Sequence, residues 1–591
     1  MKRGVALVLF LIGLALTVSA AGVLLLYLMA GGEPSVPTRA TLVLRPGGDL
    51  HELPGDSVIG LVGQADAGTL TAYIESLRKA KRDPRIAAVL LAPRGFSSPY
   101  WARIQELRDA VLDFRTSGKP VVAFLEYGGD REYYLASAAD RVLLMPSATL
   151  DLTGVATYEV FLRGALDWVG TYPDFLKIGA YKTAVNQLTE RTFTPAHREM
   201  SESLTREAYD QLVRGIADGR GLAEDDVRAA IDRGPFLPDA ALAAGLVDDL
   251  AYEDQIDDVA TELPEDWTSH RVSQADYARV TWSAIGVSRP SRIAVIHAVG
   301  AINFGRSSFD PVGGGVLGSD SLIADIRRAR ADSSIRAIVL RIDSPGGSSA
   351  ASDAIWRELM ITRERGLPLI VSMSDLAASG GYYIAMPGEV IVAEPGTLTG
   401  SIGIYSGKFA TGGTLEKFGV GVEAVSEGAQ AEIYSPTRPF SDNERARIQA
   451  QIDAFYAGFL EKAARSRHTT PDKIDQVAQG RVWTGRQARQ HGLVDELGGL
   501  MDAVAIAKQR SGVPADEEVE LVHYPEARGL YDLLTAELQD PGYGASSAAS
   551  LDALLGLLPP RERVALAAAL TPARLFRSGE VLAYMPYVFL R

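Results

Sequence analysis

The sequence predicts an α/β fold built as a tandem duplication and preceded by one N-terminal transmembrane helix. Three observations indicate this fold. Landmark residues recur at a constant offset, short apolar strands alternate with amphipathic helices in the same order in both halves, and an uncharged apolar run opens the chain. Alternation of this kind is typical of βαβ units. With 591 residues the chain is too long for a single core, so two large repeats are expected.

The duplication is visible as pairs of residues 249 positions apart. The pairs are Asp83 and Asp332, Ile86 and Ile335, Tyr133-Tyr134 and Tyr382-Tyr383, Pro146 and Pro395, and Gly154 and Gly403. Both halves also end in a similar short segment, at 244–248 and 491–495, and these two segments are 247 positions apart. Chance rarely keeps one offset over so many landmarks. The halves are therefore expected to be copies of one fold, with two residues lost between landmarks.

The strands and helices are expected in the same order in both halves. The first half predicts a strand at 40–44, a helix at 70–81 and strands at 86–91 and 121–125. The second half predicts a strand at 293–296, a helix at 321–331 and strands at 335–340 and 369–373. We therefore expect a first repeat over residues 40–255, a connector over 256–291 and a second repeat over 292–511.

Residues 512–591 have no counterpart in the first half and are interpreted as a C-terminal extension. Two of its stretches, 548–558 and 581–590, are apolar. Such stretches favour a packing or oligomer surface, with contact to a membrane as the alternative.

An apolar segment at the N-terminus predicts a membrane anchor over residues 1–32. Residues 5–30 carry no charge and follow Lys2-Arg3. A spanning helix needs about 20 apolar residues, whereas the apolar region of a cleaved signal peptide has about 7 to 15. Val18-Ser19-Ala20 resembles a cleavage site, but the apolar run continues beyond it, which favours the anchor. The basic flank keeps the N-terminus in the cytoplasm and places the rest of the chain on the other side of the membrane.

Composition argues against several kinds of function. The net charge is −15, which disfavours a nucleic-acid partner because phosphate binding needs clustered basic side chains. Cysteine is absent, which excludes disulfides, thiol catalysis and Cys-ligated metals. The glycine run 313–318 lacks the Gly-Lys-Ser/Thr ending of a phosphate loop, and no dinucleotide fingerprint or metal-ligand spacing occurs. We expect no cofactor and no metal.

Two glycine-rich segments of the second half carry the candidate chemistry. Ser344–Ser348 follows a strand that ends at Asp343, and its adjacent glycines can turn the backbone sharply and present bare N–H groups. Asp343 either orients this loop or caps the strand. In Ala377–Tyr383, Ser379 stands between small residues, which suits a nucleophile that faces an oxyanion hole. A plain turn is the alternative for the glycine loop.

A serine nucleophile also needs a base to remove its proton. Histidine is the usual base, but none occurs between His297 and His468, so a Ser-His-Asp triad is disfavoured. A lysine can act instead if desolvation or nearby positive charge lowers its pKa from near 10.4. Lys182 lies among apolar and small neighbours in the segment 177–185 and is the candidate. The plainer alternative is a solvated surface lysine.

Taken together, these segments resemble the signal peptide peptidase family of SppA type, also called protease IV, in its long, tandem-duplicated 67K form. The resemblance runs from the N-terminal anchor to about residue 510. It rests on the Ser-Pro-Gly-Gly loop, the Ala-Ser-Gly-Gly-Tyr segment, Leu398–Gly403 and Tyr181–Val185, which occur in the family's order. It implies that Ser379 is the nucleophile, that Lys182 is the general base and that Ser401 orients the lysine. It also implies an oxyanion hole made by the N–H groups of Gly380 and of Gly346 or Gly347.

The resemblance further implies repeats like those of ClpP and crotonase proteins, with stacked βαβ units, and a homo-oligomer, by resemblance a tetramer. The implied activity is that of a membrane-anchored serine endopeptidase that degrades apolar peptides, including signal peptides left after export. Its location would be the bacterial inner membrane, with the catalytic part on the periplasmic side. The chain departs from the family at Thr183 and Asn186-Gln187, where Ser and Glu-Pro are common. The alternatives are a crotonase-type acyl-CoA enzyme and a non-catalytic ring scaffold.

The repeat tests this interpretation independently. Applying the offset of 249, Ser379 matches Asp130, Lys182 matches Ala431, and Gly346-Gly347 match Ser97-Ser98. Neither half therefore keeps a complete site. A working site must combine Ser379 with Lys182 across the boundary between the repeats, either within one chain or between neighbouring chains.

Overall fold

A computed structural model of the chain describes residues 34–53, 68–259, 270–288, 290–310, 314–526 and 574–586, together with positions 13–14, 566, 571 and 589–590. The predicted N-terminal anchor lies almost wholly outside these residues, and the apolar stretch 548–558 lies outside them entirely. Within the described ranges, no helix is both long and apolar enough to cross a membrane.

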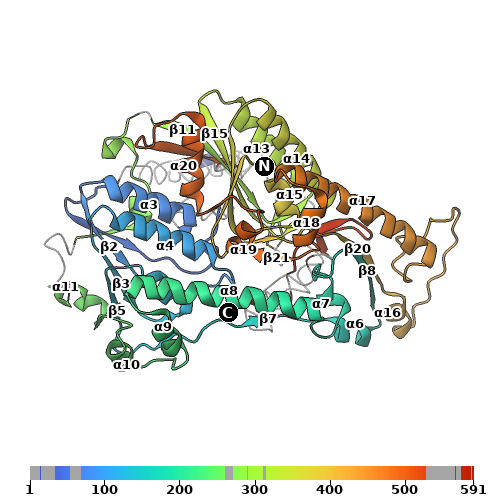
Figure 1. The fold of residues 1–591 in the computed structure, drawn as a ribbon, viewed down its shortest axis with the longest axis horizontal. Helices are drawn as coiled ribbons and strands as arrows, with labels where there is room; N and C mark the ends of the chain where they lie inside the picture. Colours follow the sequence, from blue (N-terminus) through green and yellow to red (C-terminus); the bar gives the residue numbers. More distant parts are fainter. Residues whose placement is uncertain are drawn as a thin grey trace, which may run out of the picture.

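The first repeat is built on a six-stranded sheet whose neighbouring strands all run parallel (Figure 1). In spatial order the strands are β10 (Arg271–Ser273), β1 (Ala40–Leu44), β2 (Ile86–Leu91), β3 (Val121–Leu125), β5 (Arg141–Leu144) and β9 (Asp249–Leu250). Helices of this repeat include α3 (Leu70–Arg82), α4 (Ala102–Arg115) and α5 (Asp130–Ala136). The strands predicted at 40–44, 86–91 and 121–125 are confirmed at those bounds. Strand β10 lies in the predicted connector and extends the sheet beside β1.

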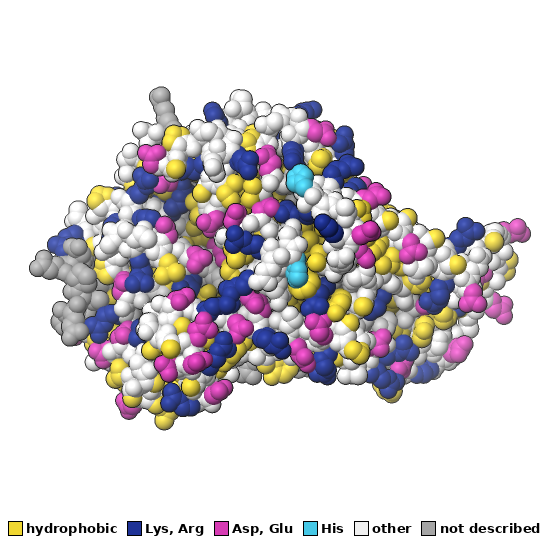
Figure 2. Space-filling model, viewed as in Figure 1, with side chains coloured by type: hydrophobic (Ala, Val, Ile, Leu, Met, Phe, Trp, Pro, Cys, Tyr) yellow, Lys and Arg dark blue, Asp and Glu magenta, His cyan; other side chains and the backbone are white. Residues whose placement is uncertain are grey.

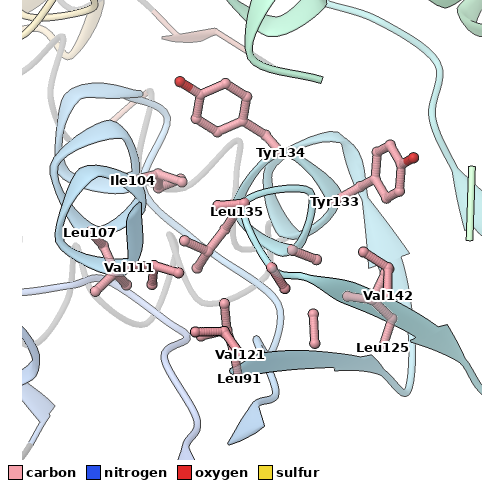
Figure 3. Packing of buried hydrophobic residues seen from close by; sticks show 14 of the residues in the cluster. Leu91, Ile104, Leu107, Val111, Val121, Leu125, Tyr133, Tyr134, Leu135 and Val142 are labelled. Carbon is pink, nitrogen blue, oxygen red and sulfur yellow. The ribbon is translucent and has the colours of Figure 1, made fainter. Parts of the chain in front are cut away.

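Apolar side chains from helices and strands fill the core of this repeat, and Figure 3 shows part of it around α4 and α5. On α4, Ile104, Leu107 and Val111 share one face because they are spaced three and four residues apart, and they lie over the sheet. They meet Leu91 and Val121 of the neighbouring strands β2 and β3, all of them buried. Burying each such side chain stabilises the fold by about 1.5–3 kcal/mol.

The second repeat contains an eight-stranded sheet. Its main path is β21 (Val482–Thr484), β19 (Leu398–Gly400), β17 (Leu369–Ala378), β15 (Ile335–Ser344), β11 (Ser291–Val299) and β23 (Val519–Tyr524), with β18 (Val390–Ala393) beside β17 and β22 (Glu496–Leu497) beside β18. Its helices include α13 (Ser319–Ala331), α14 (Ser349–Glu364), α15 (Gly380–Ala385) and α20 (Leu500–Ser511). Strands β15 and β17 continue past their predicted ends, because the polar and small residues there still pair with the neighbouring strand. They lead directly into the glycine loop and Ser379.

The two repeats show the duplication in detail. Helices α3 and α13 begin and end 249 positions apart. The Tyr133 hydroxyl donates to the Leu246 carbonyl at 2.6 Å, and the Tyr382 hydroxyl donates to the Leu493 carbonyl at 3.0 Å. These bonds tie the matching segments together in the same way, so the chain is a tandem duplication of one α/β domain.

A third sheet joins the two repeats. Its strands in order are β13 (Ser308–Asp310), β14 (Gly314–Gly318), β12 (Ala301–Asn303), β16 (Gly346–Ser348), β24 (Leu582–Tyr584), β20 (Tyr405–Ala410) and β8 (Tyr172–Lys177). Strand β8 comes from the first repeat and pairs antiparallel with β20 of the second. Strand β24 comes from the C-terminal extension and pairs antiparallel with both β16 and β20.

Other elements complete the fold. The remaining described strands and α-helices are β4 (Gly128–Gly129), β6 (Leu150–Asp151), β7 (Thr157–Tyr158), β25 (Phe589–Leu590), α6 (Arg163–Val169), α7 (Asn186–Thr189), α8 (Pro195–Arg220), α9 (Glu224–Ile231), α10 (Pro238–Ala243), α11 (Ile256–Val259), α12 (Gln274–Tyr277), α16 (Gly412–Lys417), α17 (Asp442–Ser466), α18 (Pro471–Val477) and α19 (Gly485–Gln490). The long helix α8 runs under both repeats in Figure 1 and packs Met200 and Leu204 against Ala378 of β17.

Buried ion pairs also connect the repeats. Arg341 of β15 is fully buried and donates to Glu52 at 2.7 and 3.0 Å and to Glu106 at 2.6 Å, both in the first repeat. Burial pushes the pKa of Glu52 up, but the charge and hydrogen bonds of Arg341 outweigh it and hold this pKa at about 2. Arg103 of the first repeat donates to Asp343 at the end of the same strand. The relative position of the repeats is therefore fixed by charge as well as by packing.

Candidate active site

Ser379 stands where strand β17 ends and helix α15 begins, in a backbone conformation that serine rarely adopts. Its φ is 57° and its ψ is −110°. Such a conformation costs on the order of 1–3 kcal/mol and persists only where the surroundings enforce it. The Ser379 N–H donates to the Gly400 carbonyl at 2.8 Å, and the Tyr383 N–H donates to the Ser379 carbonyl at 2.8 Å. Bonds from a strand and from a helix thus hold the serine in place.

Lys182 lies in the loop that follows strand β8, and residues of the second repeat hold this loop. The Ile178 N–H donates to the Ile404 carbonyl at 2.9 Å, and the Tyr181 N–H donates to the Gln479 carbonyl at 3.0 Å. The antiparallel pairing of β8 with β20 brings the loop to this position. A segment of the first repeat is thereby built into the second.

The structure brings Lys182, Ser379 and Ser401 together within a single chain. The Lys182 Nζ lies 2.8 Å from the Ser379 Oγ, 3.1 Å from the Ser401 Oγ and 3.1 Å from the Ser401 carbonyl oxygen. All three side chains are fully buried. The predicted combination across the boundary between the repeats therefore forms inside one molecule, and Ser401 contacts the lysine as the resemblance implied.

The surroundings of Lys182 disfavour its charged form. Burial lowers the pKa of Lys182 well below its usual 10.5, and no carboxylate in the part of the chain that the structure describes opposes this shift. A neutral amine within hydrogen-bond distance of a serine hydroxyl can accept the hydroxyl proton. The short distance to the Ser379 hydroxyl and the lowered pKa both favour Lys182 as the base.

The predicted oxyanion glycines lie beside Ser379. Gly346 has a φ of +98°, and its N–H already donates to the Ser344 Oγ at 3.2 Å. A side chain on Gly380 would come within 3.0 Å of the Gly347 nitrogen, so these two backbone segments are in close contact. Because the Gly346 N–H is engaged, the structure favours Gly347 over Gly346 as the partner of Gly380.

Other residues that the sequence singled out lie as follows. Asp343 accepts from the Leu376 N–H at 3.1 Å and from Arg103, so it braces strand β17 and the interface between the repeats. Asp130, at the position that matches Ser379, has no hydroxyl group and accepts from the N–H groups of Thr153 and Gly154. Among the described residues, no group of three or more His, Asp or Glu is arranged to hold a metal ion.

The positions that depart from the family lie beside the lysine loop. Thr183, Asn186 and Gln187 are all buried. Asn186 accepts from the Lys177 ammonium at 2.6 Å. Asn186 thus links the loop to the end of strand β8.

Gly480 is a site residue that sequence reasoning missed. Its φ is +79°, and a side chain there would come within 2.5 Å of the Lys182 nitrogen and Cα. Its own N–H donates to the Ile402 carbonyl at 2.8 Å. A single glycine before Arg481 gives no signal in a sequence, because its role comes from the lysine loop, almost 300 positions earlier, that packs against it.

Gly480→Ala is expected to lower kcat for peptide hydrolysis by about 10²-fold, since the added methyl displaces the backbone of Lys182 and a shift of about 1 Å in a reacting group has an effect of this size. Steady-state kinetics with a fluorogenic peptide measures the loss. The matched control is Gly492→Ala, which has the same kind of backbone, with a φ of +72°, and no atom within 4 Å of the added methyl. An equal effect of both substitutions would show that backbone strain, and not contact with Lys182, causes the loss.

A buried lysine that contacts a serine hydroxyl beside paired glycine amides defines a class of protein, the serine hydrolases that use a lysine base. Comparison with known proteins then narrows this class. The sequence model of peptidase family S49 matches residues 113–265 and 361–514, one segment in each repeat. The chain belongs to peptidase family S49, in the form with two copies of the domain, and is a serine protease.

Individual relatives agree with the family match. The chain is 36% identical to the chloroplastic serine protease SPPA of Arabidopsis thaliana over 83% of its own length and 72% of the relative's. It is 33% identical to Protease 4 of Salmonella typhi, over 83% of this chain and 79% of the relative, and 29% identical to Protease 4 of Haemophilus influenzae, over 80% and 77%. These matches support a peptidase rather than an acyl-CoA enzyme of crotonase type.

Proposed function

We propose that the chain is a serine endopeptidase with a Ser379–Lys182 dyad, and that it degrades apolar peptides, among them signal peptides left in the membrane after export. One observation carries the proposal. The Lys182 Nζ lies 2.8 Å from the Ser379 Oγ, and both groups are fully buried. Membership of peptidase family S49 supports the peptide as the class of substrate.

The proposed reaction begins when Lys182 accepts the Ser379 proton while the hydroxyl oxygen attacks the peptide carbonyl. The N–H groups of Gly380 and Gly347 stabilise the negative oxygen. The new ammonium group keeps its contacts with the Ser401 hydroxyl and carbonyl, then gives its proton to the leaving amine. Water, deprotonated by the neutral Lys182, hydrolyses the acyl-enzyme and restores Ser379.

The proposed setting follows from features outside the dyad. The apolar run at 5–30 would anchor the chain in the bacterial inner membrane by a single helix and keep the ClpP-like and crotonase-like repeats on the periplasmic side. This position would bring the site close to apolar peptides in the bilayer. We propose no nucleic-acid partner, because acidic and basic side chains are interspersed over the face drawn in Figure 2.

A homo-oligomer, a tetramer by family resemblance, is also proposed. Helices α6 and α16 lie together at the right of the molecule in Figure 1 and expose large apolar side chains. Trp168 on α6 is 81% exposed, and Phe418 after α16 is 80% exposed. Neighbouring copies of the chain would bury them.

The pH profile tests the proposed base. A lysine with an unshifted pKa would be neutral in only about one molecule in 10³ near pH 7.5. Because burial lowers the pKa of Lys182, kcat/KM is expected to rise with pH as the ammonium loses its proton and to reach its plateau well below pH 10.5. The measurement uses a fluorogenic apolar peptide between about pH 6 and about pH 10.

Two controls accompany this profile. Ser379→Ala should show no hydrolysis at any pH, and a polar peptide of equal length should be a poor substrate. Hydrolysis that rises with a midpoint near 10.5 would contradict the buried lysine base. Equal hydrolysis by wild type and Ser379→Ala would contradict the nucleophile.

A further inference from the structure

Strand β17 is irregular just before it reaches the nucleophile. Ile342 of β15 lies opposite Met373 of β17. Ser344, two positions later on β15, lies opposite Ala377, four positions later on β17. Strand β17 therefore carries extra residues here, and we call residues 374–376 the bulge. A bulge bends a strand, increases its twist and re-aims the side chains beside it, so this one sets the direction in which the chain reaches the nucleophile.

An arginine of the first repeat holds the bulge. Arg103 of α4 is buried, its backbone N–H donates to the Asp375 Oδ1 at 3.1 Å, and its Nε lies 3.3 Å from the Asp375 Oδ2. Another nitrogen of the guanidinium group donates to Asp343, which in turn accepts from the Leu376 N–H at 3.1 Å. Arg103 thus holds Asp375 directly and Leu376 through Asp343.

Other contacts of the bulge also come from both repeats. The Ser98 hydroxyl of the first repeat donates to the Asp375 Oδ2 at 3.3 Å. The Ser374 hydroxyl donates to Glu52 of the first repeat, and the Ser374 carbonyl accepts from the Thr397 hydroxyl of the second repeat at 2.7 Å. Side chains of both repeats therefore support the bulge, where the regular pairing with β15 is interrupted.

The segment that carries Ser98 and Arg103 is the first repeat's counterpart of the glycine loop. Applying the offset of 249, residues 97–103 match residues 346–352. Serines stand in place of the two adjacent glycines, and Arg103 stands in place of Ser352. The first repeat has no nucleophile at the matching position, and the polar side chains of this segment contact the catalytic strand of the second repeat instead.

A carboxyl group at the place of Asp375 is not favourable in itself. Burial raises the pKa of Asp375 to about 6, the charge of Arg103 opposes this shift, and the nearby Asp343 adds to it. A carboxyl group buried beside a second one lowers stability unless a cation compensates both. Carboxyl groups perturbed in this way concentrate at functional sites. The position that Asp375 gives to β17 explains its presence better than stability does.

We propose that Arg103 of the first repeat is a positioning residue for Ser379, and that together with Asp375 it fixes the bulge that presents the Ser379 hydroxyl to the base. The proposal rests on the proposed function, because it takes Ser379 as the nucleophile. Only two residues separate the bulge from Ser379, whose backbone conformation persists only where the surroundings enforce it. A shift of about 1 Å in a reacting group can lower a rate by about 10²-fold.

The test measures kcat and KM of full-length proteins for a fluorogenic apolar peptide, together with the rate at which a fluorophosphonate labels Ser379. Asp375→Ala removes both contacts with Arg103 but leaves the guanidinium group paired with Asp343 and Asp49, so the variant is expected to fold. We expect kcat and the labelling rate to fall at least about tenfold while KM stays within about twofold of the wild type, because the nucleophile is displaced and peptide binding is not. Arg103→Met should act in the same way. The double variant should lose no more kcat than Arg103→Met alone, since both residues act through one bulge.

The matched control is Arg78→Met. Arg78 of α3 also pairs with the second repeat, through Glu518 at 2.5 Å, next to strand β23 at the edge of the sheet. Its loss weakens the contact between the repeats without changing the bulge. The kcat of Arg78→Met should therefore stay within about twofold of the wild type.

Wild-type kcat in folded Asp375→Ala would overturn the proposal, as would a loss confined to KM, an equal loss in Arg78→Met, or losses that multiply in the double variant. If Asp375→Ala is unfolded at the assay temperature, Asp375→Asn is measured instead. It keeps the size of the side chain without the charge, and its kcat should fall at least about threefold. Failure of the proposed function would look different, since Ser379→Ala would then cut the peptide as the wild type does.

Discussion

Lys182→Met is expected to lower kcat for peptide hydrolysis by about 10³-fold or more, because it removes the amine that contacts the Ser379 hydroxyl. Methionine is a suitable replacement. It has about the length of lysine and is apolar, and the position is fully buried, so it fits without a charge. Steady-state kinetics with a fluorogenic apolar peptide gives kcat, and the rate of Ser379 labelling by a fluorophosphonate gives an independent measure of nucleophile activation.

The control is another lysine that burial affects. Lys119 of the first repeat donates to the Ala80 and Asp83 carbonyls at 2.7 Å, and burial lowers its pKa as well. Lys119→Met should leave kcat within about twofold of the wild type. If Lys182→Met kept a tenth of the wild-type activity or more, another group would have to be the base.

Arg341→Met is expected to give the largest loss of stability, about 3–5 kcal/mol in the free energy of unfolding at neutral pH, because it leaves a buried carboxylate without its partner. Arg341 is fully buried and pairs with Glu52 and Glu106 from the other repeat. Arg341 holds the pKa of Glu52 at about 2 against the effect of burial, so without Arg341 the Glu52 carboxylate must either stay charged in a buried place or bind a proton, and both lower stability. Urea unfolding followed by circular dichroism measures the loss.

Two further variants separate the ion pair from packing. Arg357 of α14 is an exposed arginine with a contact to Glu364 at 3.5 Å, and Arg357→Met should change stability by no more than about 1 kcal/mol. Adding Glu52→Gln to Arg341→Met should recover part of the loss, since it removes the unpaired charge. The loss of stability caused by Glu52→Gln alone is also measured. If the double variant lost the sum of the two single losses, Arg341 and Glu52 would not be coupled.

Much of the fold could be predicted from the sequence because the relevant signals are local. The strands at 86–91 and 121–125 are uninterrupted apolar runs, and the structure confirms both at those bounds. The constant offset predicted that Ser379 must meet Lys182 across the boundary between the repeats. The structure brings the two together within one chain, which the sequence had left open.

The rest could not be predicted, because it depends on contacts between distant segments. The role of Gly480 appears only when the lysine loop packs against it. The predicted connector contributes strand β10 to the first sheet. Its charged composition gives no indication of a strand. The apolar stretch 581–590 predicts a packing or oligomer surface, or contact with a membrane, and Leu582 and Tyr584 do pack in a buried cluster, but nothing in the sequence indicates that residues 582–584 form a strand between β16 and β20. A strand's apolar composition does not indicate which edge it will join.

One chain supplies both members of the dyad in this structure, so two inactive chains that are mixed should be unable to restore each other's activity. Ser379→Ala and Lys182→Met chains are co-expressed with different affinity tags, and complexes that carry both tags are purified and assayed with the fluorogenic peptide. Because the Lys182 Nζ lies 2.8 Å from the Ser379 Oγ of the same chain, the mixed complexes are expected to be as inactive as either variant alone. Recovery of about a quarter of the wild-type activity, the fraction expected if sites form at random between neighbouring chains, would show that Ser379 and Lys182 pair between chains.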